Sequence, residues 1–201
     1  MAPDRTEELD IDPAPEPTSS AAVRRLVAEL PVLDGIEAEH RDRAMAWLDS
    51  TTDIFRRAKP ATPDPHLVTY VVVVDPATGD VLLADHRLSG LWLPAGGHVD
   101  PGEHPTTSAA RELGEELGLP ATSLVGDGPR FLTWTPTRGP DSHVDVSLWY
   151  VAAADRSLPL EWDRREFHGV RWWSRTELRD RATEGFKPHL SRFLAKIDSS
   201  T

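Results

Sequence analysis

The sequence has no cysteine among its 201 residues, and it holds little positive charge. Without cysteine, disulfide bonds, thiolate zinc sites and cysteine nucleophiles are all excluded. Lys and Arg together number 22, against 33 Asp and Glu, which leaves a net charge of −11. A nucleic-acid polymer and an anionic membrane both require clustered basic residues, so neither is an expected partner.

Long apolar runs are missing as well. No stretch reaches the roughly 18 consecutive apolar residues of a membrane-spanning helix. The first five residues, MAPDR, do not begin the apolar core of a secretory signal peptide, so the cytoplasm is the default expected location. Apolar residues make up 39% of the chain and charged residues 27%, a balance typical of a globular domain.

The N-terminal third divides into a tail, a helical extension and a linker. Residues 1–20 are rich in Pro, Asp, Glu, Ala and Ser, so they are expected to be a disordered tail. The extension, 21–65, carries a short helix at 21–30 and a longer amphipathic helix at 35–58, each indicated by apolar residues at helical spacing. Three prolines in 59–65 then forbid helix and predict a linker.

From residue 66 to 201 the pattern predicts one compact domain. Pro105 in the first turn and Gly118 at the exit bound an expected helix at 105–117. A short apolar piece at 91–93 precedes a Gly-rich loop. The other expected elements are strands at 67–74, 81–86, 131–135, 144–152 and 169–173, and helices at 175–182 and 186–197. This interleaving predicts an α/β or α+β layered fold.

Residues 97–119, GHVDPGEHPTTSAARELGEELGL, carry the strongest chemical signal. On the expected helix, Glu112, Glu115 and Glu116 are spaced i, i+3 and i+4 and so share one face. Three like charges there repel one another, which a bound cation would relieve. Carboxylate oxygens are the ligands that Mg²⁺ takes, so the spacing predicts a magnesium site, with Mn²⁺ as a substitute.

The same segment matches, at every defined position, the Nudix box G-x5-E-x7-R-E-U-x-E-E-x-G-U, where U is bulky and apolar. The chain therefore resembles the Nudix (MutT-like) hydrolase family. Segments 91–94 and 171–178 extend the resemblance, which covers about 66–182. The resemblance implies an α/β/α sandwich with a mixed β-sheet. It also implies that Glu103 and Arg111 pair and give structural support to the box.

The resemblance further implies roles for individual residues in a Mg²⁺-dependent hydrolysis of a phosphoanhydride bond. The metal ligands would be Glu112, Glu115 and Glu116, joined by the backbone carbonyl of Gly97. The general base would be Glu112 or Glu116 in the box, which we favour. A later loop acid is the alternative, and the two acids before the closing strand are Asp163 and Glu166.

Several side chains outside these roles are candidates for substrate binding. Arg87 and His98 could contact a substrate phosphate, although a solvated arginine is an equally good interpretation of Arg87. Trp134 and Trp162 are the tryptophans placed to stack on a base, although most tryptophans are core residues. His98 and His104 lack a usual zinc-ligand spacing, so a zinc site there is not favoured.

The substrate and the role of the extension stay open at this level. The resemblance allows a nucleoside or deoxynucleoside triphosphate, ADP-ribose or a nucleotide sugar. Pro136 weakly favours ADP-ribose, and the tyrosine typical of dinucleoside polyphosphate hydrolases is missing. A ligand-sensing Nudix-like module without turnover is the alternative class. The extension could pack on the domain, form a homodimer or shape the substrate mouth, and the first two are favoured.

Overall fold

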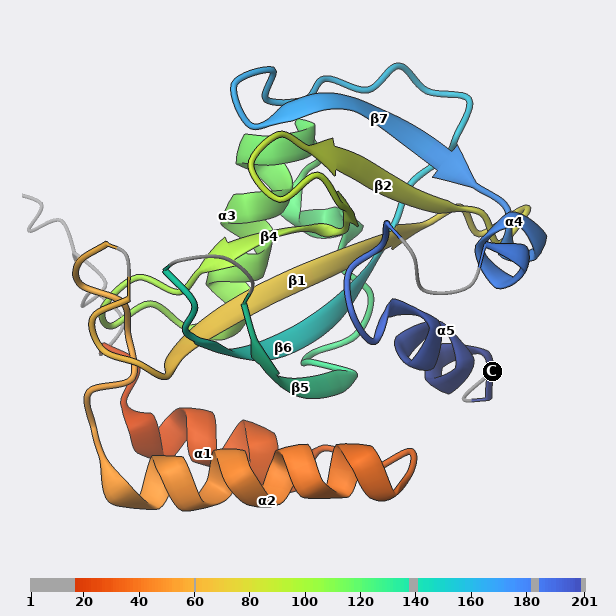
Figure 1. Ribbon diagram of the computed structural model, residues 1–201. Coiled ribbons are helices and arrows are strands. Elements are labelled where there is room, and N and C mark those ends of the chain that lie inside the picture. Colours follow the sequence, from red (N-terminus) through yellow and green to blue (C-terminus); the bar gives the residue numbers. More distant parts are fainter. Residues whose placement is uncertain (1–16, 60, 138–140, 182–184, 200–201) are drawn as a thin grey trace, which may run out of the picture.

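The computed structural model describes residues 17–59, 61–137, 141–181 and 185–199, and it is built on one seven-stranded sheet. Figure 1 shows helices on both faces of this sheet, with two further helices below it. The strand order is β3-β2-β1-β6-β5, while β4 pairs with β1 and β7 with β2. The strands are β1 His66–Val74, β2 Val81–His86, β3 Trp92–Leu93, β4 Ala95–His98, β5 Phe131–Pro136, β6 Val144–Ala153 and β7 Phe167–Trp173. The predicted layered fold with a mixed sheet is confirmed.

Strand β1 organises the sheet because three strands pair with it. It runs parallel to β6 along its whole length, from His66 opposite Asp145 to Val74 opposite Ala153. On its other side, β4 pairs antiparallel with the first half of β1, and β2 pairs antiparallel with its end. Parallel and antiparallel neighbours therefore meet on one strand, which is the mixed sheet expected from the sequence.

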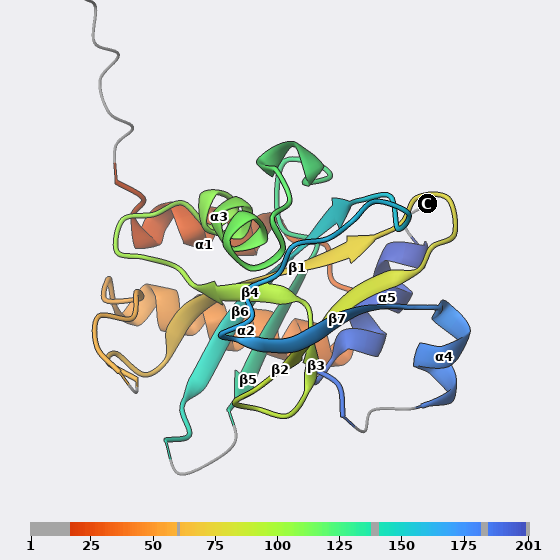
Figure 2. The same ribbon diagram turned by 90° about the horizontal axis from the view of Figure 1, so that it is seen from above.

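The two faces of β1 belong to two different apolar cores, because side chains alternate along a strand. Leu67 and Val71 lie in the core that contains the inner side of α3 (Pro105–Leu117). Val68 and Tyr70 lie in the core that contains Phe193 and its neighbours on α5 (Leu190–Ser199). Figure 2 shows α3 on one side of the sheet and α4 (Arg175–Asp180) with α5 on the other.

The N-terminal helices, α1 (Ser20–Glu29) and α2 (Gly35–Ser50), pack on the sheet. Buried side chains of both helices, including Val23 and Trp47, share a core with β1 and α3. Figure 1 shows α2 running beneath β5, and Glu37 of α2 accepts a hydrogen bond from the backbone N–H of Leu132 at 3.3 Å. The packing role expected for the extension is therefore present in the structure.

Several predicted boundaries are wrong. The expected disordered tail 1–20 extends too far, because Ser19 caps α1 and the N–H of Thr18 donates to the carbonyl of Gly102 at 2.8 Å. Residues 1–16 lie outside the described residues. The helix expected over 35–58 ends at Ser50, since Thr51 is extended. The predicted helix over 186–197 begins only at Leu190.

The predicted Gly-rich loop after residue 93 contains a strand, β4 (Ala95–His98). The ends of several other helices and strands differ from the predicted ends by a few residues. A short 3-10 turn, Ala121–Ser123, and the strand residues 167 and 168 were not expected, and residue 182 of the predicted 175–182 helix lies outside the described residues.

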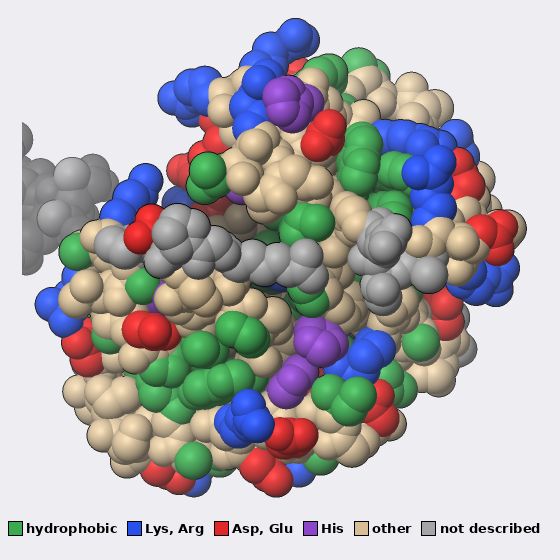
Figure 3. All heavy atoms as spheres, in the orientation of Figure 1, with side chains coloured by type: hydrophobic (Ala, Val, Ile, Leu, Met, Phe, Trp, Pro, Cys, Tyr) green, Lys and Arg blue, Asp and Glu red, His purple; other side chains and the backbone are tan. Residues whose placement is uncertain are grey.

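None of the helices in the described part of the chain combines the length and hydropathy that crossing a bilayer requires. On the face in Figure 3, basic side chains lie in separate groups with acidic side chains among them. The described residues on that face therefore form no continuous basic stripe of the kind that follows a nucleic-acid backbone.

Candidate active site

Helix α3 carries the glutamates of the box, and both of its ends are fixed locally. Its side-chain cap is His104, which accepts a hydrogen bond from the N–H of Thr106 at 3.2 Å, and Pro105 occupies the first turn. At the other end, Gly118 is left-handed with φ 64°, and its N–H donates to the carbonyl of Gly114. A residue without Cβ adopts this conformation at least cost. The predicted helix 105–117 is confirmed to the residue.

Arg111 connects α3 to the loop before it. Its guanidinium donates two parallel hydrogen bonds of 3.0 Å to the Glu103 carboxylate, a third to the His98 carbonyl at 3.1 Å, and a fourth to Glu112 at 2.8 Å. Burial would raise the pKa of Glu103, but the hydrogen bonds from Arg111 and from the N–H of Asp100 outweigh it and lower that pKa. The expected pairing of Arg111 with Glu103 is present.

Two glycines of β4 allow close contacts, one with α3 and the other with β1. A Cβ built on Gly97 would overlap the Glu112 carboxylate, and one on Gly96 would overlap the carbonyl of Thr69. The N–H of Gly96 donates to Glu116 Oε2 at 2.8 Å. Glu112 and Glu116 are therefore held against β4 and are buried. Glu115, in contrast, is largely exposed and pairs with Arg111 at 3.1 Å.

One depression in the surface collects the acidic groups of the box and of the loop before β7. Burial raises the pKa of Glu116 to about 9, and the nearby carboxylates of Glu112 and Glu166 raise it further. Burial likewise raises the pKa of Glu112, although Arg111 opposes this shift. Such a set favours a bound cation, because otherwise like charges face one another in a poorly solvated place. The lining residues are Glu112, Glu115, Glu116, Asp163, Arg165 and Glu166.

The two loop acids have different surroundings. Asp163 pairs with Arg165 at 2.6 Å, and this hydrogen bonding lowers its pKa to about 2. Glu166 lines the same depression as the box glutamates. Its backbone is held by Arg87, whose N–H donates to the Glu166 carbonyl at 2.9 Å and whose side chain donates to the carbonyls of Arg164 and Phe167.

The three expected substrate-binding residues do not lie together. Arg87 supports the loop that carries Glu166 through the contacts above. The ring centroid of Trp134 on β5 lies 6.1 Å from that of Trp47 on α2, so Trp134 contacts the extension. The ring centroid of His98 lies 4.9 Å from that of His66. None of these contacts tests a substrate role, which stays a prediction for all three residues.

A second group of polar residues was not predicted from the sequence. His66, His143 and Asp145 gather with His98 at one end of the sheet. The H-x-D spacing of His143 and Asp145, which puts both on one face of a strand, is the signal that the sequence offered. His66 and His98 join them because β1 pairs with both β4 and β6. This strand register cannot be derived from the sequence.

Comparison with known proteins identifies the family of this chain. The model of the NUDIX domain matches residues 64–196, which is more than half of the sequence. The chain therefore belongs to the Nudix family. The asymmetrical bis(5'-nucleosyl)-tetraphosphatases of mouse (Mus musculus) and rat (Rattus norvegicus) are 31% and 32% identical to it over 83 residues. This alignment covers 40% of this chain and 54% of each relative, so the chain spans about half the length of these curated relatives.

Two solved structures illustrate the fold that this chain shares with known proteins. The E. coli dihydroneopterin triphosphate pyrophosphohydrolase matches with a TM-score of 0.57 and 17% identity, covering 74% of this chain and 99% of that one. A C. elegans Ap4A hydrolase matches with a TM-score of 0.51 and 18% identity, covering 67% and 96%. At such low identities the likeness concerns the fold alone.

Proposed function

We propose that this Nudix protein is a Mg²⁺-dependent hydrolase that cleaves a phosphoanhydride bond in a nucleoside diphosphate linked to a further group. One observation carries the proposal: Glu112, Glu115, Glu116 and Glu166 line a single depression beside the Gly-rich strand β4. Buried carboxylates with raised pKa values are typical of catalytic sites and of sites that hold divalent cations. Family membership supports the same chemistry.

The donor set fits magnesium, because it consists of carboxylate oxygens and lies beside backbone carbonyls. Glu112, Glu115, Glu116 and the carbonyl of Gly97 would hold the ion, with Mn²⁺ as a substitute. When bound, the ion would lower the charge on the phosphate oxygens and acidify the attacking water. The raised pKa values of Glu112 and Glu116 belong to the metal-free protein, and a cation would return both groups to the ionised form.

The residues of the chain itself would position the reactants and move a proton. We favour a box glutamate, Glu112 or Glu116, as general base, and Glu166 is the alternative because it lines the same depression. Asp163 suits this role less well, since Arg165 already neutralises it. Arg111 and Glu103 would keep loop and helix in register, so that the carboxylates stay fixed during the reaction.

The substrate class remains a nucleoside or deoxynucleoside triphosphate, ADP-ribose or a nucleotide sugar. The names of the mouse and rat relatives add dinucleoside tetraphosphates to this set. The position after the box where that subclass tends to carry a tyrosine, near Pro136, has none, so the relatives and the motif point in different directions. For the helical extension, a homodimer contact is a separate proposal, which light scattering of the purified chain would test.

The first experiment measures phosphate and nucleotide release from this substrate panel with Mg²⁺ and with Mn²⁺. We expect one preferred substrate whose turnover is lost with EDTA. Glu116→Gln should lower kcat by orders of magnitude with an unchanged circular dichroism spectrum, because it removes a charged carboxylate from the site. Glu39→Gln, on the exposed side of α2, is the matched control and should retain full activity.

Two results would contradict the proposal. Near-full activity in Glu116→Gln would remove Glu116 from the machinery. No turnover of any substrate by the unaltered protein, with either metal, would favour instead a ligand-sensing module without catalysis.

A further inference from the structure

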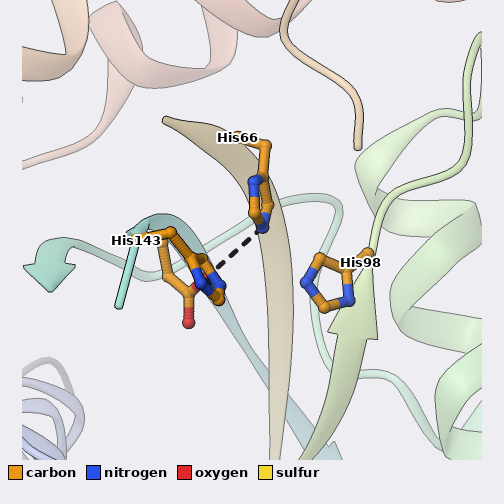
Figure 4. A group of neighbouring side chains, drawn as sticks. His66, His98 and His143 are labelled. Atoms are coloured by element: carbon orange, nitrogen blue, oxygen red, sulfur yellow. Dashed lines mark ion pairs between the residues drawn. The ribbon is translucent and has the colours of Figure 1, made fainter. Parts of the chain in front are cut away.

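A second cluster of metal-ligating side chains lies away from the carboxylate depression. His66 at the start of β1, His98 at the end of β4, His143 just before β6 and Asp145 near its start each offer one ligand atom, and these atoms all lie within 4.8 Å of one another. Figure 4 shows the ring of His66 pointing into the space between His143 and His98.

The cluster and the box lie on opposite faces of the sheet. His66 is two residues before Val68 on β1, and Val68 belongs to the core beneath α5. His98 pairs with Val68, and Asp145 pairs with His66, so all three side chains project to that face. Gly97, next to His98, faces α3 and Glu112 instead. The two groups of ligands are therefore separate sites, and β4 carries residues of both, since Gly97 and His98 are neighbours.

Several ligand atoms of the cluster, which face the space between the three histidines, have no hydrogen-bond partner in the rest of the described chain. Within the described residues, His66 Nε2, His98 Nε2 and Asp145 Oδ1 are buried and have no hydrogen-bond partner. A buried polar atom without a partner is costly, so such atoms are rare unless a water or an ion satisfies them. Three such atoms around one gap form a set of donors that a bound cation would satisfy. The other carboxylate oxygen of Asp145 is already engaged, since Oδ2 lies 3.8 Å from Lys187 Nζ.

Two of the imidazoles are oriented as metal ligands usually are. His66 Nδ1 donates to the carbonyl of Pro63 at 2.8 Å, and His143 Nδ1 donates to the carbonyl of Asp141 at 2.8 Å. With the proton held on Nδ1, the lone pair of each Nε2 points away from that carbonyl and is available to a cation.

We propose that His66, His98, His143 and Asp145 bind one divalent transition-metal ion, with Zn²⁺ as the best match. Three imidazole nitrogens and one carboxylate oxygen form a donor set that zinc accepts in tetrahedral geometry. Ligand atoms around such an ion lie about 3.4 Å apart, given zinc–ligand distances of about 2.0–2.1 Å. Asp145 Oδ1 already lies 3.3 Å from His143 Nε2 and 3.7 Å from His66 Nε2. Imidazole donors select against Mg²⁺, which the box is proposed to bind.

Four protein ligands close a tetrahedral shell, so this ion would have a structural role rather than a catalytic one. It would join β1, β4 and β6 at the end of the sheet where their side chains converge. Because His98 follows Gly97 directly, the ion would also fix the end of β4 against which the box glutamates pack.

The test uses the full-length, untagged protein, stripped of metal and then titrated with Zn²⁺ and with Co²⁺. We expect about one Zn²⁺ per chain by elemental analysis, a rise in Tm on zinc addition, and the intense visible absorption of tetrahedral Co²⁺. His143→Gln and Asp145→Asn should weaken zinc binding by more than about 100-fold, because even outer partners of metal ligands contribute about 10–100-fold. The His143 side chain is in contact with solvent, so His143→Gln is the variant expected to fold.

Two further variants distinguish zinc bound at this cluster from zinc bound at a surface histidine or at the box. His168→Gln changes an exposed histidine on β7 and should leave zinc binding unchanged. Glu116→Gln should also leave zinc binding unchanged, because the box is a separate site on the other face of the sheet. The proposal is overturned if the unaltered protein takes up no zinc, if His143→Gln and Asp145→Asn retain it, or if Glu116→Gln loses it.

Discussion

At the scale of single residues, Gly97 shows how closely the sheet backbone and the helix carboxylates approach. A Cβ at this position would overlap Glu112, whose carboxylate also accepts a hydrogen bond from Arg111. Gly97→Ala should therefore displace Glu112 and lower kcat by about 100-fold, the usual effect of moving a catalytic group by about 1 Å. Steady-state kinetics at several Mg²⁺ concentrations measures the loss.

The matched control for that substitution is Gly128→Ala, where a Cβ would meet nothing within 4 Å. This variant should be as active as the unaltered protein. Equal activity in the two alanine variants would mean that the close contact at Gly97 has no bearing on catalysis.

The buried carboxyl of Glu116 predicts a pH dependence of stability in EDTA. Its pKa of about 9 in the folded protein exceeds that of an exposed glutamate, so the folded state binds more protons between the two values. Stability from this group is present at low pH and is lost as pH rises toward 9. Denaturant titrations should therefore give a free energy of unfolding that falls from pH 7 to pH 9.

The titration has to be made above pH 7, because histidines with lowered pKa values, such as His98 and His189, have the opposite effect at lower pH. Their contribution to the free energy of unfolding rises with pH up to the ordinary pKa of histidine. Above pH 7 their contribution is complete. Glu116→Gln should flatten the slope between pH 7 and pH 9, and excess Mg²⁺ should do the same. An equally steep slope in Glu116→Gln would assign the dependence to another group.

At the scale of elements, a buried ion pair joins α2 to α5. Lys196 Nζ lies 2.6 Å from Glu37 Oε1, and the side chains are 9% and 2% exposed. Glu37 also accepts from the N–H groups of Leu33 and Leu132. Lys196→Met preserves the apolar stem but leaves the Glu37 charge uncompensated. It should lower the free energy of unfolding by about 3–5 kcal/mol, measured by denaturant titration.

An exposed ion pair in the same region serves as the control. Arg24 of α1 pairs with Asp49 of α2 at 2.5 Å, with side chains 43% and 56% exposed. Arg24→Met should change the free energy of unfolding far less than Lys196→Met does, because solvent screens such pairs. A similar loss in both variants would show that burial is not what distinguishes them.

The elements that could be predicted from the sequence are those with local signals at both ends. The predicted bounds of α3 are correct to the residue because Pro105 and Gly118 mark them. The helix predicted over 35–58 is too long because Ile54 and Phe55 continue the helical spacing, although Ile54 is buried in a non-helical segment whose carbonyl accepts from Leu67. The sequence predicts a loop in place of strand β4 because its glycines lack strand propensity, and pairing with β1 decides its conformation.

The candidate sites divide in the same way. The box could be predicted because its three glutamate ligands lie on one helix, within five residues, and their spacing alone puts them on one face. The histidine cluster draws on three strands that are far apart in sequence. Its members meet only because Val68 lies opposite His98 and His66 lies opposite Asp145, and that register depends on the whole sheet.

At the scale of the whole molecule, the N-terminal helices complete the fold. They bury one side of a shared core, and α2 covers β5, the last strand in the sheet order. Deleting residues 1–58 should expose apolar side chains and an unpaired strand edge, both of which promote association. Light scattering and Tm measurements should show aggregation and a lower Tm. A truncated protein with unchanged solubility, oligomeric state and turnover rate would mean that the extension has no structural role.

The contact between Glu37 and Lys196 also has a consequence for the order in which a nascent chain can fold on the ribosome. Domains generally fold as units during synthesis, so contacts between distant parts of one domain form late. Here the Glu37 carboxylate has its cationic partner 159 residues later in the chain. Helices α1 and α2 can form early, but the contact of α2 with α5 cannot form until Lys196 has been translated. The strands of the described sheet, which end at Trp173, are therefore all translated before the contact between α2 and α5 can form.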